Sequence, residues 1–449
     1  IQFLQGLKPF GVRPGLERIR RLVELAGHPE RGLRFLHVAG TNGKGSTCAF
    51  LESIYREAGY RTGLFTSPHL VRFGERIQLN RCLLADEALT GLVCEVRSLL
   101  GRCPDWEESP TFFEVVTLMA LIHFARAGCD LVIWETGLGG RLDATNVVMP
   151  LATLITSIGL DHEAWLGSTL GGIAREKAGI FKPGVPAFSA VTDPEPRSVI
   201  EEVARGVGAP LRVLEAGDPE PALLAGLELP LPGAHQRRNA ALALAAVEAL
   251  RPVIPVSGEA IRRGLAEARW AGRLQIVQRG RARVVIDGAH NEEGVVALCA
   301  ALRTAFPGER PAFLMGILRD KSAERILTHL LPACRGRGVV VPVQSDRSMD
   351  PADLAQRCRD VDPRIEIQTA PNVAAGLGLL AEEPLVLITG SLYLVGEGLE
   401  ALGLADSETA GQGGRSLNET HFPLSPPADA LVVMCSRLSR EKRPELALD

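Results

Sequence analysis

Short apolar runs rich in β-branched residues recur along the chain, and most of them end at a glycine-rich turn. Such runs predict buried strands. Segments whose apolar residues have the spacing of a helix alternate with them, as in Ser46–Gly59 and Ser257–Ala268. Strands that alternate with helices predict an α/β fold with parallel sheets, whose ligands bind beyond the carboxyl ends of the strands. The expected strands are Arg34–Ala39, Asp130–Glu135, Ala152–Ile158, Arg283–Asp287, Pro311–Gly316, Gly338–Val343 and Leu385–Gly390.

A domain boundary is expected near residues 268–274. A helical pattern ends there, and Trp270-Ala271-Gly272-Arg273 precedes a new strand. The expected units are residues 1–271 and a smaller α/β unit at 272–404. Residues 405–449 are rich in Ser, Pro, Gly and charge, with an apolar run at Ala430–Met434, and are expected to form a poorly ordered tail.

Composition narrows the functional classes. Because 49 Lys and Arg oppose 53 Asp and Glu, the net charge of −4 offers no broad basic surface for nucleic acid or for a membrane. Nine cysteines without CxxC pairs favour a reducing compartment over a disulfide framework. No apolar run is as long as a membrane-spanning helix, and the first residues do not resemble a signal peptide. We therefore expect a cytoplasmic globular protein; the sequence begins at Ile1 rather than Met, so its natural start stays open.

The segment Gly40-Thr41-Asn42-Gly43-Lys44-Gly45-Ser46 carries the strongest chemical signal, because it joins an expected strand to an expected helix. Its glycines allow backbone amides to approach phosphate oxygens, Lys44 can neutralise phosphate, and Ser46 can reach Mg²⁺. Gly45 separates Lys44 from Ser46, so the segment departs from the usual G-x-x-x-x-G-K-[ST] pattern. A glycine turn with a solvated lysine is the less favoured alternative.

Two further strand ends carry polar groups. Glu135 ends an otherwise apolar strand beside a glycine loop, which suits an oxygen ligand for Mg²⁺ better than a surface carboxylate. In that loop, Arg141 and Asp143 either fix a polar substrate or form an ion pair. After the next strand, His162 is a candidate metal ligand oriented by Asp161, or a hydrogen-bonded surface residue.

Later segments give weaker signals. Lys177 lies where a helix ends at Gly179, and spacing alone favours a cation that merely complements the helix dipole. Asp287 and Ser391 follow strands, where they can hold a nucleotide sugar or a small substrate, or simply serve the turns.

Together these segments resemble the folylpolyglutamate synthase and dihydrofolate synthase family, among the Mur-ligase-like ATP-dependent amide ligases. The matching segments, spread over residues 1–403, are GTNGKGS, SPHL, GLGGRLDATN, GLDH, EKAGI, LPGAHQRRN, DGAHN and TGSLYLV. The resemblance implies a P-loop ATPase-like parallel-sheet domain over 1–271 and a Rossmann-like glutamate-ligase domain over 272–404.

The implied reaction begins when ATP phosphorylates a carboxylate, and L-glutamate then attacks the acyl phosphate to form an amide. The acceptors would be dihydropteroate and the γ-carboxyl group of a folate. A monofunctional folylpolyglutamate synthase is the close alternative, and a nucleotide-binding module without catalysis is the more distant one. Neither nucleic acid nor membrane is an expected partner, and the family suggests a monomer.

The resemblance also implies roles for single residues. ATP would be held by Thr41, Asn42, Gly43, Lys44, Gly45, Ser46, Asn239, Arg273 and Asp287, with Arg273 at the γ-phosphate. Magnesium, at two expected sites, would be bound by Ser46, Ser67, Glu135, His162 and a carbamylated Lys177. Lys44, His162, Lys177 and Arg273 would be the catalytic set. The substrates would be contacted by Arg141, by Asp143 and Phe112 on the pterin side, and by His290 and Ser391 on the glutamate side.

Overall fold

A computed structural model of the chain describes residues 2–7, 15–102, 106, 109–215 and 217–405. Within these ranges the strands form one sheet of eight strands and one of six. Both sheets belong to one compact unit. The expected boundary between residues 271 and 272 falls between the last helix packed on the first sheet and the first strand of the second. The domain limits stay a prediction, and the expected tail lies outside the described residues from residue 406 on.

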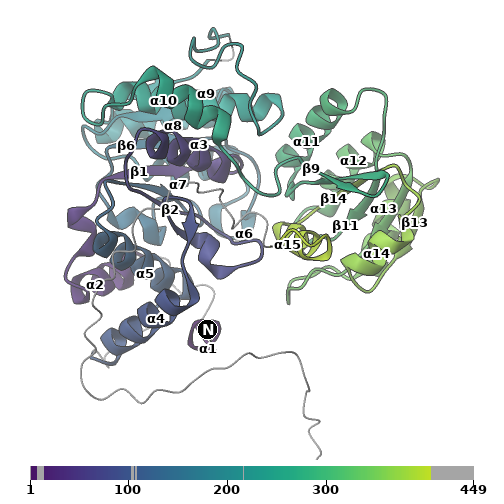
Figure 1. Cartoon of the computed structure of the whole chain (residues 1–449), viewed down its shortest axis with the longest axis horizontal. Helices are drawn as coiled ribbons and strands as arrows, with labels where there is room; N and C mark the ends of the chain where they lie inside the picture. The colour runs from purple at the N-terminus through teal and green to yellow at the C-terminus, as the bar shows by residue number, and fades with distance from the viewer. Residues whose placement is uncertain (1, 8–14, 103–105, 107–108, 216, 406–449) are drawn as a thin grey trace, which may run out of the picture. The chain divides into compact units, whose positions relative to one another are not determined.

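The first sheet has the strand order β4-β3-β2-β5-β1-β6-β7-β8 (Figure 1). Its two central strands, β1 and β5, are buried along their whole length, which explains why they read as continuous apolar runs. The strands are β1 Phe35–Ala39, β2 Thr62–Phe65, β3 Ile77–Leu79, β4 Cys82–Leu83, β5 Leu131–Glu135, β6 Ala152–Ile155, β7 Ala187–Ser189 and β8 Leu211–Val213.

Helices cover both faces of this sheet. Leu36 and Val38 of β1 pack under α3, α9 and α10, whereas Phe35 packs against α2, α4 and α5 on the opposite face (Figure 1). The α-helices of this region are α1 Gln2–Gln5, α2 Glu17–Leu25, α3 Lys44–Glu57, α4 Asp86–Gly101, α5 Phe112–Ala127, α6 Glu163–Leu166, α7 Leu170–Ala178, α8 Pro194–Val207, α9 Ala234–Leu250 and α10 Gly258–Glu267. Short 3₁₀ helices occur at η1 Pro29–Gly32, η2 Phe73–Arg76 and η3 Ala144–Val147.

The second sheet has the order β13-β12-β11-β14-β10-β9. Its strands are β9 Gln275–Arg279, β10 Ala282–Ile286, β11 Ala312–Met315, β12 Arg337–Val340, β13 Glu366–Thr369 and β14 Leu385–Thr389. Its helices are α11 Glu292–Ala305, α12 Ala323–Leu330, η4 Leu331–Ala333, α13 Pro351–Val361, α14 Val373–Leu379 and α15 Leu392–Ala401. One core holds α11, α12 and α13, and the other holds α14 and α15. No helix in the described ranges has the length and apolar character needed to cross a membrane.

The predicted α/β class and all seven predicted strands are confirmed, but the sheets are not purely parallel. At their edges β3 pairs antiparallel with β2 and β4, and β9 pairs antiparallel with β10. The β3–β4 hairpin turns through Asn80 and Arg81, both with positive φ. These edge strands are short or partly exposed, so they lack the continuous apolar run that identifies a central strand.

Candidate active site

A cavity of about 410 Å³ collects residues from the carboxyl ends of strands in both sheets. Such ends are the usual ligand-binding position in open α/β sheets. Most of the predicted residues line it: Thr41, Asn42, Gly43, Lys44, Gly45, Ser46, Ser67, Glu135, His162, Lys177, Asn239, Arg273, Asp287 and His290. Four predicted substrate residues do not line it: Phe112, Arg141, Asp143 and Ser391.

The glycine-rich loop joins β1 to the first turn of α3. The Lys44 ammonium donates to the carbonyl oxygens of Gly40, at 3.0 Å, and Thr41, at 3.2 Å. The Ser46 hydroxyl is buried without a hydrogen-bond partner among the described residues. Since the first amides of a helix lack intrahelical acceptors, this end of α3 is suited to an anion.

Close packing explains the extra glycine of this loop. A Cβ atom on Gly45 would lie 2.7 Å from the indole nitrogen of Trp270. A Cβ atom on Gly43, whose φ is +84°, would lie 2.5 Å from the side-chain oxygen of Asn239. The departure from the usual loop pattern at Gly45 therefore accommodates Trp270, and the glycine at position 43 accommodates Asn239.

Glu135 ends β5 inside the cavity. Ser67 donates its backbone amide to the Glu135 carboxylate at 3.2 Å. Burial raises the pKa of Glu135 to about 7, although the nearby Lys44 ammonium acts in the opposite direction. Within the described ranges no group of three or more His, Cys, Asp or Glu side chains is placed to hold a metal ion. A cation bound here would therefore also need ligands of other kinds, such as hydroxyl groups.

Lys177 lies in the last turn of α7, where spacing alone favoured a cation that merely complements the helix dipole, but it is buried and lines the cavity. It is 5% exposed, and its ammonium donates to the carbonyl oxygen of Gly40 at 2.9 Å. Burial, followed by repulsion from Lys44, lowers the pKa of Lys177 to about 7. A buried amine of that pKa is substantially neutral near physiological pH.

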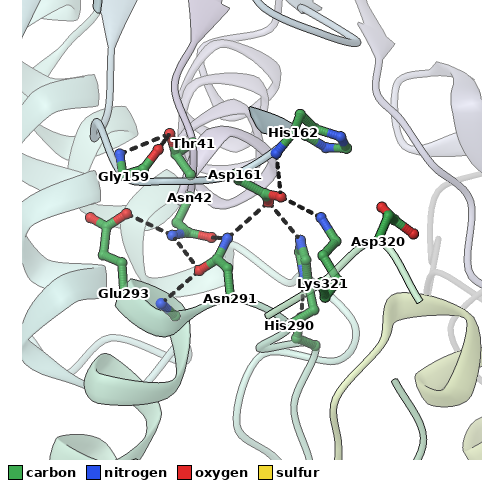
Figure 2. A network of polar contacts seen from close by, with 12 residues as sticks. Thr41, Asn42, Gly159, Asp161, His162, His290, Asn291, Glu293, Asp320 and Lys321 are labelled. Carbon is green, nitrogen blue, oxygen red and sulfur yellow. Dashed lines mark hydrogen bonds and ion pairs between the residues drawn. The ribbon is translucent and has the colours of Figure 1, made fainter. Parts of the chain in front are cut away.

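Asp161 is the centre of a polar network that joins the two sheets (Figure 2). Its carboxylate accepts from the His162 backbone amide at 2.8 Å and from the Asn291 side chain at 3.0 Å. It also pairs with the Lys321 ammonium and lies 3.5 Å from the His290 ring. Although burial acts to raise it, these partners hold the pKa of Asp161 well below its usual range. The hydrogen bond from His162 to Asp161 comes from the backbone amide, so a role of Asp161 in orienting His162 stays a prediction.

The same network reaches the phosphate loop. The Asn42 side chain donates to Asn291 at 3.0 Å and to Glu293 at 2.7 Å (Figure 2). Glu293 also accepts from Ser157 at 3.1 Å. Sequence reasoning missed Lys321 and Glu293. The position of Lys321 after β11 was an available signal, because that strand also ends at the cavity edge of its sheet.

The predicted substrate residues are mostly engaged with the protein itself. Asp143 accepts from the amides of Gly137 and Leu138, at 3.0 and 2.7 Å, and so shapes the glycine loop. Arg141 forms its ion pair with Glu176, at 2.8 Å, and not with Asp143. Ser391 is buried and caps α15.

The predicted nucleotide residues also have partners. Asp287 accepts from the amides of Leu274 and Ala289, at 2.8 and 2.9 Å. The Asn239 side chain donates to Gln236 at 3.0 Å, and Arg273 donates to the carbonyl oxygen of Gly272 at 3.1 Å. The Asp287 carboxylate therefore links the loop that follows β10 to Leu274, the residue before β9.

Comparison with known proteins identifies the family. The chain is 40% identical over 421 residues to the dihydrofolate synthase/folylpolyglutamate synthase of Bacillus subtilis, covering 88% of this chain and 96% of that protein. This chain belongs to the dihydrofolate synthase/folylpolyglutamate synthase family. Residues 272–392 match the family described as "Mur ligase, glutamate ligase domain". Members of this family are ligases that form C–N bonds, so the predicted enzyme class is confirmed.

Solved structures of the family agree with the fold. Escherichia coli FolC in complex with DHPP and ADP is similar with a TM-score of 0.79 and 35% identity, covering 90% of this chain and 96% of that one. Mycobacterium tuberculosis folylpolyglutamate synthase complexed with ADP has a TM-score of 0.82 and 30% identity, covering 90% and 97%. The Yersinia pestis bifunctional enzyme was solved with AMPPNP and a Mn ion, with a TM-score of 0.78, 30% identity and coverage of 90% and 97%. ATP and a divalent metal are therefore the expected cofactors of this family member.

Proposed function

We propose that this protein adds L-glutamate both to dihydropteroate and to the γ-carboxyl group of a folate. An acceptor carboxylate oxygen would attack the γ-phosphorus of ATP, giving an acyl phosphate and ADP. The amine of glutamate would then attack the acyl carbon, form the amide and release phosphate and a proton. The observation that carries the proposal is the shared cavity, in which the phosphate loop of one sheet faces Arg273 and His290 of the other.

The donors that line this cavity fit ATP and a divalent cation. Lys44 and the amides at the start of α3 would hold the β- and γ-phosphates, and Arg273 would bind the γ-phosphate. Bound Mg²⁺ would screen phosphate charge during transfer. The buried Ser46 hydroxyl, together with Ser67, Glu135 and His162, supplies oxygen and nitrogen ligands for it. The two metal sites expected from sequence stay a proposal.

Lys177 would complete the metal ligands as a carbamate. Its neutral amine would attack CO₂, and loss of one proton would leave an anionic carbamate. A buried amine with a pKa of about 7 is neutral in a substantial fraction of the molecules at physiological pH, and the neutral form is the one that reacts with CO₂. The Lys177 ammonium repels the Lys44 ammonium, whereas the oxygens of a carbamate at Lys177 would bind a metal cation.

Of the residues proposed to contact glutamate or the pterin, His290 lines the cavity and the others lie outside its lining. His290, in contact with the Asp161 network, and Ser391 are proposed for glutamate, while Asn239 and Asp287 are proposed for adenine and ribose. The pterin side is assigned to Phe112 and to the loop of Arg141 and Asp143. Because the Asp143 carboxylate is occupied by loop amides, we propose that it acts there by shaping the loop.

The test measures ADP release with ATP, Mg²⁺ and glutamate while only the acceptor is varied. Stimulation by both dihydropteroate and tetrahydrofolate would support the proposal. Stimulation by tetrahydrofolate alone would reduce the protein to a folylpolyglutamate synthase, the monofunctional alternative. Silence with both acceptors, despite ATP binding, would contradict the proposal.

A further inference from the structure

Arg76 is a buried cation that enters no ion pair with any of the described residues. It ends η2, downstream of the Ser67–Leu70 segment, and is only 8% exposed. Its Nε donates to Nδ1 of His69 at 2.7 Å, and its guanidinium carbon lies 5.3 Å from the centre of the Phe112 ring. In the described part of the chain, its two terminal nitrogens donate no hydrogen bond to protein and enter no ion pair.

No neighbouring group pairs directly with this charge, although the Glu75 and Glu135 carboxylates act to raise the pKa of Arg76. The Glu75 carboxylate is occupied by three backbone amides, those of Leu70, Val71 and Arg72, at 2.6 to 2.9 Å. His69 accepts a hydrogen bond from Arg76 through Nδ1, and an imidazole ring supplies no negative charge. Burial of an uncompensated charge is strongly unfavourable, so such a group is expected to receive an anion from a ligand.

Arg76 does not line the cavity, but its neighbours include one residue of the metal end and one of the proposed acceptor side. The carboxylates of Glu75 and Glu135 both favour the charged form of Arg76, and Glu135 lines the cavity. Phe112, which lies against the guanidinium, is a proposed acceptor contact. An acceptor whose reacting carboxylate lies near Glu135 would therefore bring its adjacent groups toward Arg76.

We propose that Arg76 binds the α-carboxylate of the terminal glutamate of a folate acceptor. This inference rests on the proposed function. A terminal glutamate carries two carboxylates: the γ-carboxylate reacts, and the α-carboxylate remains charged and needs a partner. A guanidinium with two free terminal nitrogens binds a carboxylate in bidentate fashion. Dihydropteroate has only its reacting carboxylate, so Arg76 determines specificity for chain elongation over addition of the first glutamate.

The first test compares acceptors in Arg76→Gln, Arg76→Lys and a matched control, Arg126→Gln. Arg126 is an exposed arginine paired with Glu95, away from the cavity. In Arg76→Gln, KM for tetrahydrofolate should rise at least about tenfold, with KM for dihydropteroate changed less than about threefold. Arg76→Lys should restore part of the loss, and thermal unfolding checks that each variant folds. Equal changes for both acceptors, or no change, would overturn the proposal.

The second test uses equilibrium binding and needs no turnover. Tetrahydrofolate is compared with its α-carboxamide, which lacks only the charge of the α-carboxylate. The wild type should bind the amide as weakly as Arg76→Gln binds tetrahydrofolate, and Arg76→Gln should distinguish the two ligands by less than about twofold. A variant that still prefers the carboxylate as strongly as the wild type would overturn the proposal. Because this arm requires only binding, its result is separate from a failure of the ligase assay.

Discussion

Asp161→Asn removes one negative charge from the point where the two sheets meet. Asp161 and Lys321 expose only 8% and 7% of their side chains, so their ion pair is buried. Neutralising one partner of a buried pair costs about 3–5 kcal/mol, because the other charge is left uncompensated. The amide can still accept from the His162 backbone, so we take the lower figure, about 3 kcal/mol. A free energy of about 3 kcal/mol corresponds to a factor on the order of a hundred in an equilibrium or rate constant, and we take this as the expected loss in kcat/KM.

The assay is glutamate-dependent ADP release, because His290 and Lys321 reach the site through this carboxylate. We expect kcat/KM for glutamate to fall by about a hundredfold, with the Kd for ATP changed less than about threefold. Asp320→Asn is the matched control, since Asp320 is the neighbouring acid and is 38% exposed. Adding Lys321→Met to Asp161→Asn should recover part of the loss, because it removes the unpaired cation. The reasoning is refuted if Asp161→Asn behaves like Asp320→Asn, or if the two changes are simply additive.

Four further predictions follow from the same geometry. Lys177→Ala should lose most activity and regain part of it with added short carboxylates; full activity without an additive would contradict a carbamate role. Arg273→Ala should lower kcat at least about tenfold while changing the Kd for ATP less, because its charge matters most as phosphate transfers, and an unchanged kcat would exclude a γ-phosphate contact. Gly45→Ala should weaken nucleotide binding at least about threefold in equilibrium titration, since its Cβ would meet Trp270 at 2.7 Å, and wild-type affinity would refute that steric argument. Burial lowers the pKa of His37 to about 3, so the unfolded state binds the proton first as pH falls below about 6.5. Between pH 6.5 and 5, the wild type should lose roughly 2 kcal/mol more unfolding free energy than His37→Gln, measured by urea denaturation, and parallel pH curves would contradict this.

The sequence predicted the central strands because strands buried on both faces must be apolar throughout. Phe35–Ala39 and Leu131–Glu135 are of this kind, and their polar ends identified the phosphate loop and Glu135. Edge strands such as Cys82–Leu83 bury too little to leave a pattern. Cys82–Leu83 could therefore be placed only through its pairing with β3.

The missed residues differ from the predicted ones in a physical way. Arg76 and Lys321 are notable because both are buried cations. Arg76 enters no ion pair among the described residues, whereas Lys321 forms an ion pair with Asp161 from the region of the other sheet. Neither property is encoded in local spacing. In contrast, Asp143 and Ser391 were visible as polar residues at turns, and the structure assigns their hydrogen bonds to the turn and the helix cap.

The two lysines of the cavity are coupled through one carbonyl group. Lys44 and Lys177 both donate to the Gly40 oxygen, at 3.0 and 2.9 Å, so two cations share one weak acceptor. Their repulsion adds to burial in lowering the pKa of Lys177 to about 7. The contact therefore prepares the amine for the proposed reaction with CO₂, because only the neutral form is a nucleophile. Carbamate formation would replace a repelling cation with an anion beside Lys44. The phosphate loop would thus favour, through its own lysine, the modification that completes the proposed metal site next to it.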